Sequence, residues 1–113
     1  MLPATHRLKA EKDFSLLARS KKSAFSKAVS MKVRENALPH SRFGVVVGIK
    51  VHKRAVKRNL LRRRIREILR KHLDEIKPGY DVMLLTQTRA LDLEYAELET
   101  QVLSCLKKLQ LIA

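Results

Sequence analysis

Several residue types are rare or absent in this chain, and each absence excludes a class of protein. Its 113 residues include one cysteine, no tryptophan, three glycines and three prolines. The lone Cys105 excludes an internal disulfide and suits a reducing compartment. Apolar runs fall short of the ~18 residues that span a bilayer, and the first residues lack the apolar stretch of a signal peptide. We therefore expect a cytoplasmic protein without a membrane span.

Acidic residues are also scarce. The chain holds 25 Lys and Arg against 11 Asp and Glu, which gives a formal net charge of +14. A folded domain tolerates such self-repulsion best when a polyanionic partner relieves it, and nucleic acid is the favoured partner. An anionic membrane surface or an acidic protein stays open as an alternative. Hydrophobic residues make up 45% of the chain, enough for one compact core, so we expect a single domain over residues 1–113.

The positive charge is concentrated between Lys50 and Lys71. This segment places eleven Lys or Arg residues against one acid, Glu67. Residues 72–113, in contrast, hold four bases and seven acids and have the composition of a scaffold. Val, Leu and Ile residues interrupt the basic run, which predicts a helix with one face in the core.

The first half of the chain predicts a short helix followed by strands. Residues 10–19 place Phe14 and Leu17 at the spacing of one helix face. Residues 24–34 alternate with period two, which predicts a half-buried strand that is bent or split in two. The apolar side of this strand would carry Phe25, Val29, Met31 and Val33. The apolar run 43–49 predicts a strand covered on both faces.

The second half predicts helix, strand and helix. The basic helix should run from near Arg54 to near Ile76, where Lys77-Pro78-Gly79 stops it. Residues 80–86 predict another covered strand, and Asp92 is the expected N-cap of a last helix. The apolar stripe of that helix is Tyr95, Leu98, Val102, Leu106 and Leu109. The element order α-β-β-β-α-β-α predicts an α/β (α+β) two-layer sandwich with three helices and one mixed sheet of about four strands.

Apolar and basic residues occupy adjoining arcs of the basic helix, each roughly 100° wide. The apolar arc should pack on the sheet and contains Leu61, Ile65, Ile68, Leu69 and Ile76. The other arc should bind neighbouring phosphates and contains Asn59, Arg62, Arg63, Arg66 and Arg70. Arginine suits this role because its planar fork can hold two phosphate oxygens. Further bases lie at the start of the helix and in the preceding loop: Lys50, Lys53, Arg54, Lys57 and Arg58.

A charged helix face can instead be merely solvated. Such a face normally carries Glu-to-Lys pairs four residues apart. Here only Glu67 and Lys71 have that spacing, beside a weaker Arg63 and Glu67 pair. Most of the arginines therefore lack a partner within the helix, which favours phosphate binding.

The segment Arg42-Phe-Gly-Val-Val-Val-Gly, followed by Ala55-Val-Lys-Arg-Asn-Leu-Leu-Arg-Arg-Arg-Ile-Arg-Glu, resembles the protein subunit of bacterial ribonuclease P. The hallmark of that family is an Arg-Asn-Arg core followed by further bases. The matching residues here are Arg58-Asn59, Arg62-Arg63 and Arg66. The resemblance extends to Arg7-Leu8-Lys9, Asp13-Phe14 and Tyr80-Asp81-Val82. Leu60 and Ile49 depart from the pattern, because basic residues are common at both positions.

The resemblance implies the protein component of a tRNA 5′-maturing endoribonuclease of the bacterial cytoplasm. The implied partners are the catalytic ribonuclease P RNA and the 5′ leader of precursor tRNA, with no DNA and no membrane. The RNA would hold the catalytic Mg²⁺, while this chain would contribute no catalytic group and no metal site of its own. The implied fold contains a left-handed β-α-β crossover, an exception to the common right-handed rule.

The family also places the single-stranded leader in a separate cleft, between the first helix and the sheet. Single strands bind in basic grooves that offer stacking platforms. Phe14 and Phe25 are the candidate platforms, with a plain core position as the alternative for each. The candidate charges are Arg7, Lys9, Lys27 and Lys32. Because the chain has only three Phe and two Tyr, leader binding should rely mainly on charge.

Other functional classes stay open. A ribosomal or other structural RNA-binding protein would share the charge and much of the architecture, without a processing role. A stand-alone nuclease would need clustered acids or histidines, and His6, His40, His52 and His72 are scattered along the chain. A membrane-surface helix would need Trp or Phe anchors, which the apolar arc lacks.

Overall fold

A mixed four-stranded sheet with the strand order β1-β2-β4-β3 forms the centre of the molecule. The structure, a computed structural model, describes residues 3–8 and 11–112. Its strands are β1 (Ser23–Phe25), β2 (Val29–Glu35), β3 (Arg42–Val46) and β4 (Tyr80–Thr86). β4 pairs antiparallel with β2 and parallel with β3.

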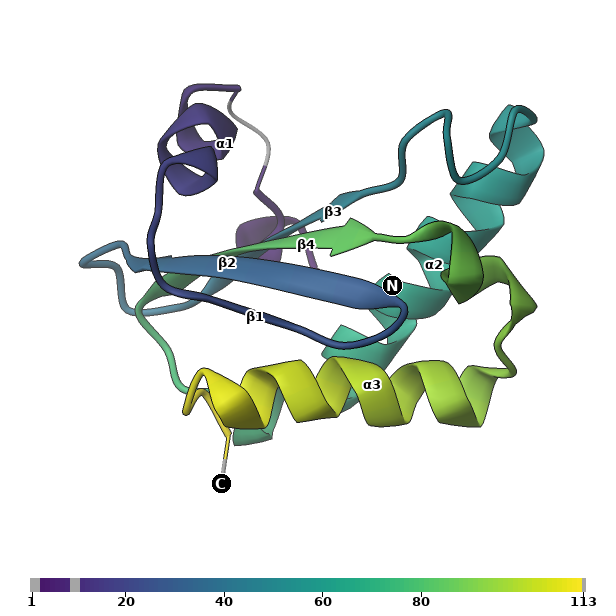
Figure 1. Ribbon diagram of the computed structural model, residues 1–113. Coiled ribbons are helices and arrows are strands. Elements are labelled where there is room, and N and C mark those ends of the chain that lie inside the picture. The colour runs from purple at the N-terminus through teal and green to yellow at the C-terminus, as the bar shows by residue number, and fades with distance from the viewer. Residues whose placement is uncertain (1–2, 9–10, 113) are drawn as a thin grey trace.

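The helices lie on both faces of this sheet (Figure 1). α2 (Ala55–Lys71) and α3 (Tyr95–Lys108) pack on one side, here called the inner face, and the short α1 (Glu11–Ala18) packs on the outer face. The predicted α+β fold and its element order are confirmed. The left hand of the β3-α2-β4 crossover stays a prediction.

Successive residues of a strand point to opposite faces, so each strand contributes to two apolar clusters. On β4, Val82 and Leu84 join the main core beneath α2 and α3. Met83, between them, points the other way and packs with Leu8 and Leu17 in a smaller cluster. This smaller cluster holds α1 against the outer face.

The strand predicted over 24–34 is split, and the split reverses the side on which Phe25 lies. Residues 26–28 form a tight connection in which the Ser26 amide donates to the Val29 carbonyl at 2.8 Å. Phe25 then pairs with Ser30 rather than continuing the buried side of β2. Its side chain is 70% exposed on the outer face. The predicted grouping of Phe25 with the buried residues of β2 is therefore wrong.

The basic helix packs as predicted but ends early. α2 buries Leu61, Ile65, Ile68 and Leu69, and starts directly after Arg54. It ends at Lys71, and Leu73–Glu75 form a 3-10 turn, so the predicted end near Ile76 is wrong. His72 leaves helical geometry where its ring lies between Glu75 and Glu99, with 3.1 Å between Nε2 and the Glu99 carboxylate. Ile76 still reaches the core from the chain beyond the turn.

Two further boundaries differ from the predictions. β3 ends at Val46 rather than residue 49. Asp92 is not the N-cap of α3, because Thr88–Asp92 form a 3-10 helix that buries Ala90, and Glu94 precedes the first turn of α3. The predicted stripe of α3 is otherwise confirmed: Tyr95 is half-buried, and the buried residues are Leu98, Val102, Leu106 and Leu109.

A buried carboxylate joins one end of the sheet to its loops. Asp81 is 2% exposed and accepts hydrogen bonds from Arg42 Nε at 2.8 Å, Arg42 Nη2 at 2.7 Å and Asn36 Nδ2 at 2.8 Å. Burial raises the pKa of the Asp81 carboxyl, but the hydrogen bonds from Arg42 and Asn36 together with the charge of Arg42 outweigh it, and the net pKa shift is downward. The ionised carboxylate thus connects β3, β4 and the loop after β2.

Arg42→Met should lower the free energy of unfolding by about 3–5 kcal/mol, because it leaves Asp81 as a buried, unpaired charge. Urea unfolding followed by circular dichroism measures this, with Arg89→Met as the control at an exposed arginine. The depressed pKa of Asp81 stabilises the fold above the unfolded-state pKa of about 4 and ceases to do so as the pH falls through the folded-state value. Equal stability of the Arg42→Met and Arg89→Met chains would contradict this assignment.

Candidate nucleic-acid interface

The exposed side of α2 forms a shallow hollow, here called the α2 hollow. It is lined by Val56, Asn59, Leu60, Arg62, Arg63 and Arg66. Four of the five residues predicted for the basic arc therefore lie together. Arg70 does not line the hollow, and its guanidinium pairs with Glu67 on the preceding turn. Lys71 forms its salt bridge with Glu99 of α3, at 2.8 Å.

Contacts within the chain orient the arginines of this surface. Arg62 Nη1 donates to Asn59 Oδ1 at 2.6 Å, and Arg62 Nη2 donates to the Val47 carbonyl at 3.4 Å. Burial lowers the pKa of Arg66, and the positive charges of Arg7 and Arg62 lower it further. Since these guanidinium groups repel one another, an anion that bound among them would relieve the repulsion.

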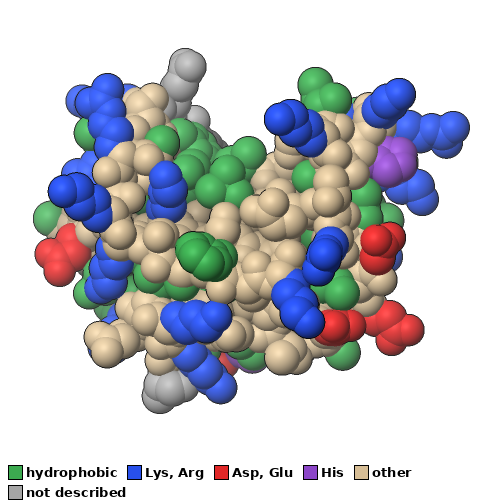
Figure 2. Space-filling model, in the orientation of Figure 1, with side chains coloured by type: hydrophobic (Ala, Val, Ile, Leu, Met, Phe, Trp, Pro, Cys, Tyr) green, Lys and Arg blue, Asp and Glu red, His purple; other side chains and the backbone are tan. Residues whose placement is uncertain are grey.

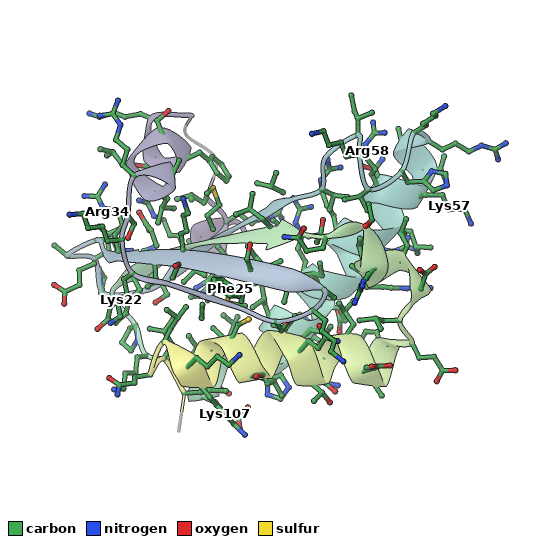
Figure 3. The ribbon with its side chains drawn as sticks, in the orientation of Figure 1. Lys22, Phe25, Arg34, Lys57, Arg58 and Lys107 are labelled. Carbon is green, nitrogen blue, oxygen red and sulfur yellow. The ribbon has the colours of Figure 1, made fainter. Side chains whose placement is uncertain are left out.

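The loop before α2 and the first turn of the helix extend the basic surface. The exposed basic residues here are Lys50, Lys53, Arg54 and Lys57. Arg58 has a structural contact as well, because its Nη1 donates to the carbonyls of His52 at 2.9 Å and Lys53 at 2.7 Å. It therefore holds the loop against the helix. Lys57 and Arg58 lie at the far end of α2 from α3, away from Phe25 (Figure 3).

A row of residues on the outer face crosses all four strands and is only partly covered. The strand register gives its members, here called the open row, as Phe25, Ser30, Leu85 and Val46. The neighbouring row is Ser23, Lys32, Met83 and Gly44. α1 covers that second row, since the Phe14 ring lies against Gly44 and Lys32 Nζ donates to the Ala18 carbonyl at 2.7 Å.

The open row forms the floor of a groove that carries positive charge. Figure 2 shows hydrophobic side chains in the depression between α1 and the N-terminal end of α2, with Lys and Arg around it. At the β1 end, Phe25 and Ser30 line a hollow with Lys27 and Arg89. At the β3 end, Val46 and Leu85 line another with Ile49 and Lys50. Lys50 therefore belongs to this groove and to the loop before α2.

The structure brings together most of the residues predicted for the cleft. Phe14, Phe25 and Lys32 lie on the outer face, and Lys27 lines the hollow beside Phe25. Arg7 is placed differently, because it lies near Arg66 of α2. The predicted Lys9 lies outside the described residues.

Sequence reasoning missed Arg89 and Leu85 as groove residues. Arg89 lies in the acidic part of the sequence, and nothing nearby in the chain relates it to Phe25. In the sequence alone, Leu85 is one more apolar residue of the covered strand predicted over residues 80–86. Only the pairing of β4 with β2 and β3 shows that it faces the groove.

Over residues 3–8 and 11–112, no helix is long and apolar enough to cross a bilayer. Over the same residues, no three His, Cys, Asp or Glu side chains lie close enough together to hold a metal ion.

The family model and the relatives found by sequence comparison agree on one family. The family model described as ribonuclease P matches residues 2–110. The ribonuclease P protein component of Synechococcus sp. (strain JA-2-3B'a(2-13)) is 35% identical over 117 residues, covering 99% of this chain and 87% of that protein. The ribonuclease P protein component of Alkaliphilus oremlandii is 31% identical and covers 98% of this chain and 96% of that protein.

Solved structures share the fold. The RNase P protein of Staphylococcus aureus superposes with a TM-score of 0.87 at 24% identity, over 96% of this chain and 98% of that chain. The RNase P protein of Thermotoga maritima gives a TM-score of 0.82 at 28% identity, over 90% of this chain and 96% of that chain. With the family model and its relatives matched over nearly its whole length, the chain belongs to the ribonuclease P protein family, the protein component of a tRNA 5′-processing ribonuclease.

Proposed function

We propose that this chain binds the catalytic ribonuclease P RNA through the α2 hollow and the basic loop before α2. In the same proposal, the 5′ leader of precursor tRNA lies along the open row. One observation carries the proposal: the molecule has two basic surfaces of different character, which adjoin in the segment around Lys50. One is a cluster of arginines on a helix, and the other is a partly covered, mainly apolar row with basic residues at both ends.

The α2 surface suits a folded RNA. Arg62, Arg63 and Arg66 project from a rigid helix, so they meet phosphates at fixed positions rather than as a flexible basic tail. Folded RNA is contacted largely through its backbone and shape, which such a fixed array of guanidinium groups can match.

The open row suits a single strand. Unstacked bases can lie on the exposed ring of Phe25 and on the apolar side chains of Val46 and Leu85, while Lys27 and Lys50 are near enough to the row to meet the phosphates. Phe14 shapes the groove from the α1 side. Contacts of this kind tolerate any leader sequence, because every base has a flat face.

The chain supplies charge and position rather than a reacting group in this proposal. The catalytic Mg²⁺ ions are held by the RNA and the precursor tRNA, within a bacterial cytoplasm. The positive charge of the bound protein lowers the repulsion between the two RNAs, so less Mg²⁺ is needed to bring them together. The whole of residues 1–113 acts as one RNA-binding domain.

Adding the chain to ribonuclease P RNA of the same organism should restore cleavage of precursor tRNA at low Mg²⁺. The stimulation should shrink at high Mg²⁺, because the cations then screen the RNA without help. The measurement is the rate of leader release across a Mg²⁺ titration, with and without the protein. Failure to stimulate at any Mg²⁺ concentration would contradict the proposal and leave a purely structural RNA-binding role.

Replacing Arg62 and Arg66 together with Ala should flatten the salt dependence of binding to the catalytic RNA. The log–log slope of the association constant against salt should lose about 1–2 units, since each phosphate contact contributes about 0.7–0.9. Lys107→Ala removes a positive charge from an exposed position on α3 and should leave the slope unchanged. If the arginine double variant keeps the slope of the unmodified chain, these arginines are solvated in the complex.

Gly44→Ala should weaken leader binding while the fold persists. The new Cβ would collide with the Phe14 ring, which must then swing away from β3 and disturb the groove. We expect about 5- to 10-fold weaker binding of precursor tRNA by the assembled enzyme and unchanged binding of mature tRNA. Lys107→Ala, at an exposed position on α3 on the other side of the sheet, is the control and should bind precursor tRNA normally. An equal loss for mature tRNA would show that the groove does not hold the leader.

A further inference from the structure

Two apolar side chains stand among the arginines of the α2 hollow. Val56 is 76% exposed, Leu60 is half-buried, and the two lie one turn apart, which makes them neighbours on the helix surface. Phosphate oxygens require hydrogen-bond donors, and aliphatic carbon offers none. A surface that met only phosphates would therefore leave these two side chains without a function.

Donors surround this apolar floor. Asn59 Oδ1 accepts from Arg62, which leaves the Asn59 amino group as the free donor of that side chain. Within residues 3–8 and 11–112, neither this amino group nor the guanidinium of Arg63 contacts a protein acceptor. The hollow thus combines an apolar floor with donors at its rim.

We infer that the α2 hollow receives an unpaired nucleobase of the catalytic RNA. The flat face of the base lies on Val56 and Leu60, and the acceptor atoms of its edge meet Asn59 or Arg63. The base must be unpaired, because the faces of paired bases are covered by their neighbours in the stack. Since the unengaged groups at the rim are mainly donors, an acceptor-rich edge such as that of guanine or uracil fits best.

This inference rests on the proposed function and sharpens it, because it adds recognition of a base to recognition of the backbone. It concerns this chain in particular, since Leu60 stands where a basic residue is common in the family pattern. Charge complementarity favours RNA as the occupant. Arg62 and Arg66 line the hollow and favour an anionic partner, and an apolar protein segment carries no such charge.

Binding of ribonuclease P RNA by Val56→Ala, Leu60→Ala and the double variant tests the inference. We expect the double variant to bind about 5- to 20-fold more weakly at every salt concentration, by analogy with the loss of one stacked base. The salt slope should not change, because no charge is removed. Leu38→Ala, at a partly exposed leucine between β2 and β3, is the matched control and should bind normally.

Chemical probing of the RNA bases supplies a second readout that a folding defect would not mimic. The unmodified chain should protect one or a few unpaired bases, and the double variant should expose them again while the backbone footprint persists. Leu60→Arg tests the alternative occupant, a phosphate group of the RNA. Tighter binding with a steeper salt slope would show that the site takes a phosphate and would overturn the inference.

The outcomes separate this inference from the proposed function. If the unmodified chain shows no salt-dependent binding to the RNA, the proposed function fails. If it binds and the arginine variants weaken it, but the Val56 and Leu60 variants match Leu38→Ala, only the inference fails. A photocrosslinker introduced at position 56 that joins a second copy of the chain, rather than an RNA base, also overturns it.

Discussion

The burial of one face of α2 against the inner face of the sheet determines how this molecule presents its charge. Leu61, Ile65, Ile68 and Leu69 are all within 1% of full burial, so the rotation of the helix about its axis is fixed. Each such side chain contributes about 1.5–3 kcal/mol relative to exposure, which offsets the repulsion among the arginines on the adjoining arc. Without this docking, the same residues would be a flexible basic segment with no preferred direction.

β4 separates the two surfaces that the proposed function uses. Its inner side holds α2 and α3 through Val82 and Leu84, and its outer side holds α1 through Met83 and exposes Leu85 to the groove. One central strand thus fixes the arginine array and the open row relative to each other. Gly44 on the neighbouring strand lets the Phe14 ring lie directly on the sheet.

Local patterns in the sequence predicted what depends on local physics. The two faces of α2 and the bounds of β4 follow from periodicity and composition. Features that depend on distant partners were not predictable. The side on which Phe25 lies depends on pairing across the 26–28 connection, and the end of α2 coincides with contacts of His72, one of them to Glu99 of another helix. Arg89 is a groove residue only through the fold. Arg70 is a different case, because its partner Glu67 lies three residues earlier on the same helix, and a comparison of pairs four residues apart did not reveal it.

Directed hydroxyl-radical cleavage tests the central claim, that the two surfaces bind different RNAs. An iron chelate would be tethered at Arg63→Cys or at Lys27→Cys in the complex with catalytic RNA and precursor tRNA. The native Cys105 does not interfere, because it is fully buried and burial raises the pKa of its thiol. The account predicts cleavage of the catalytic RNA from position 63 and of the leader from position 27. Leader cleavage from position 63, or the same cleavage pattern from both positions, would contradict it.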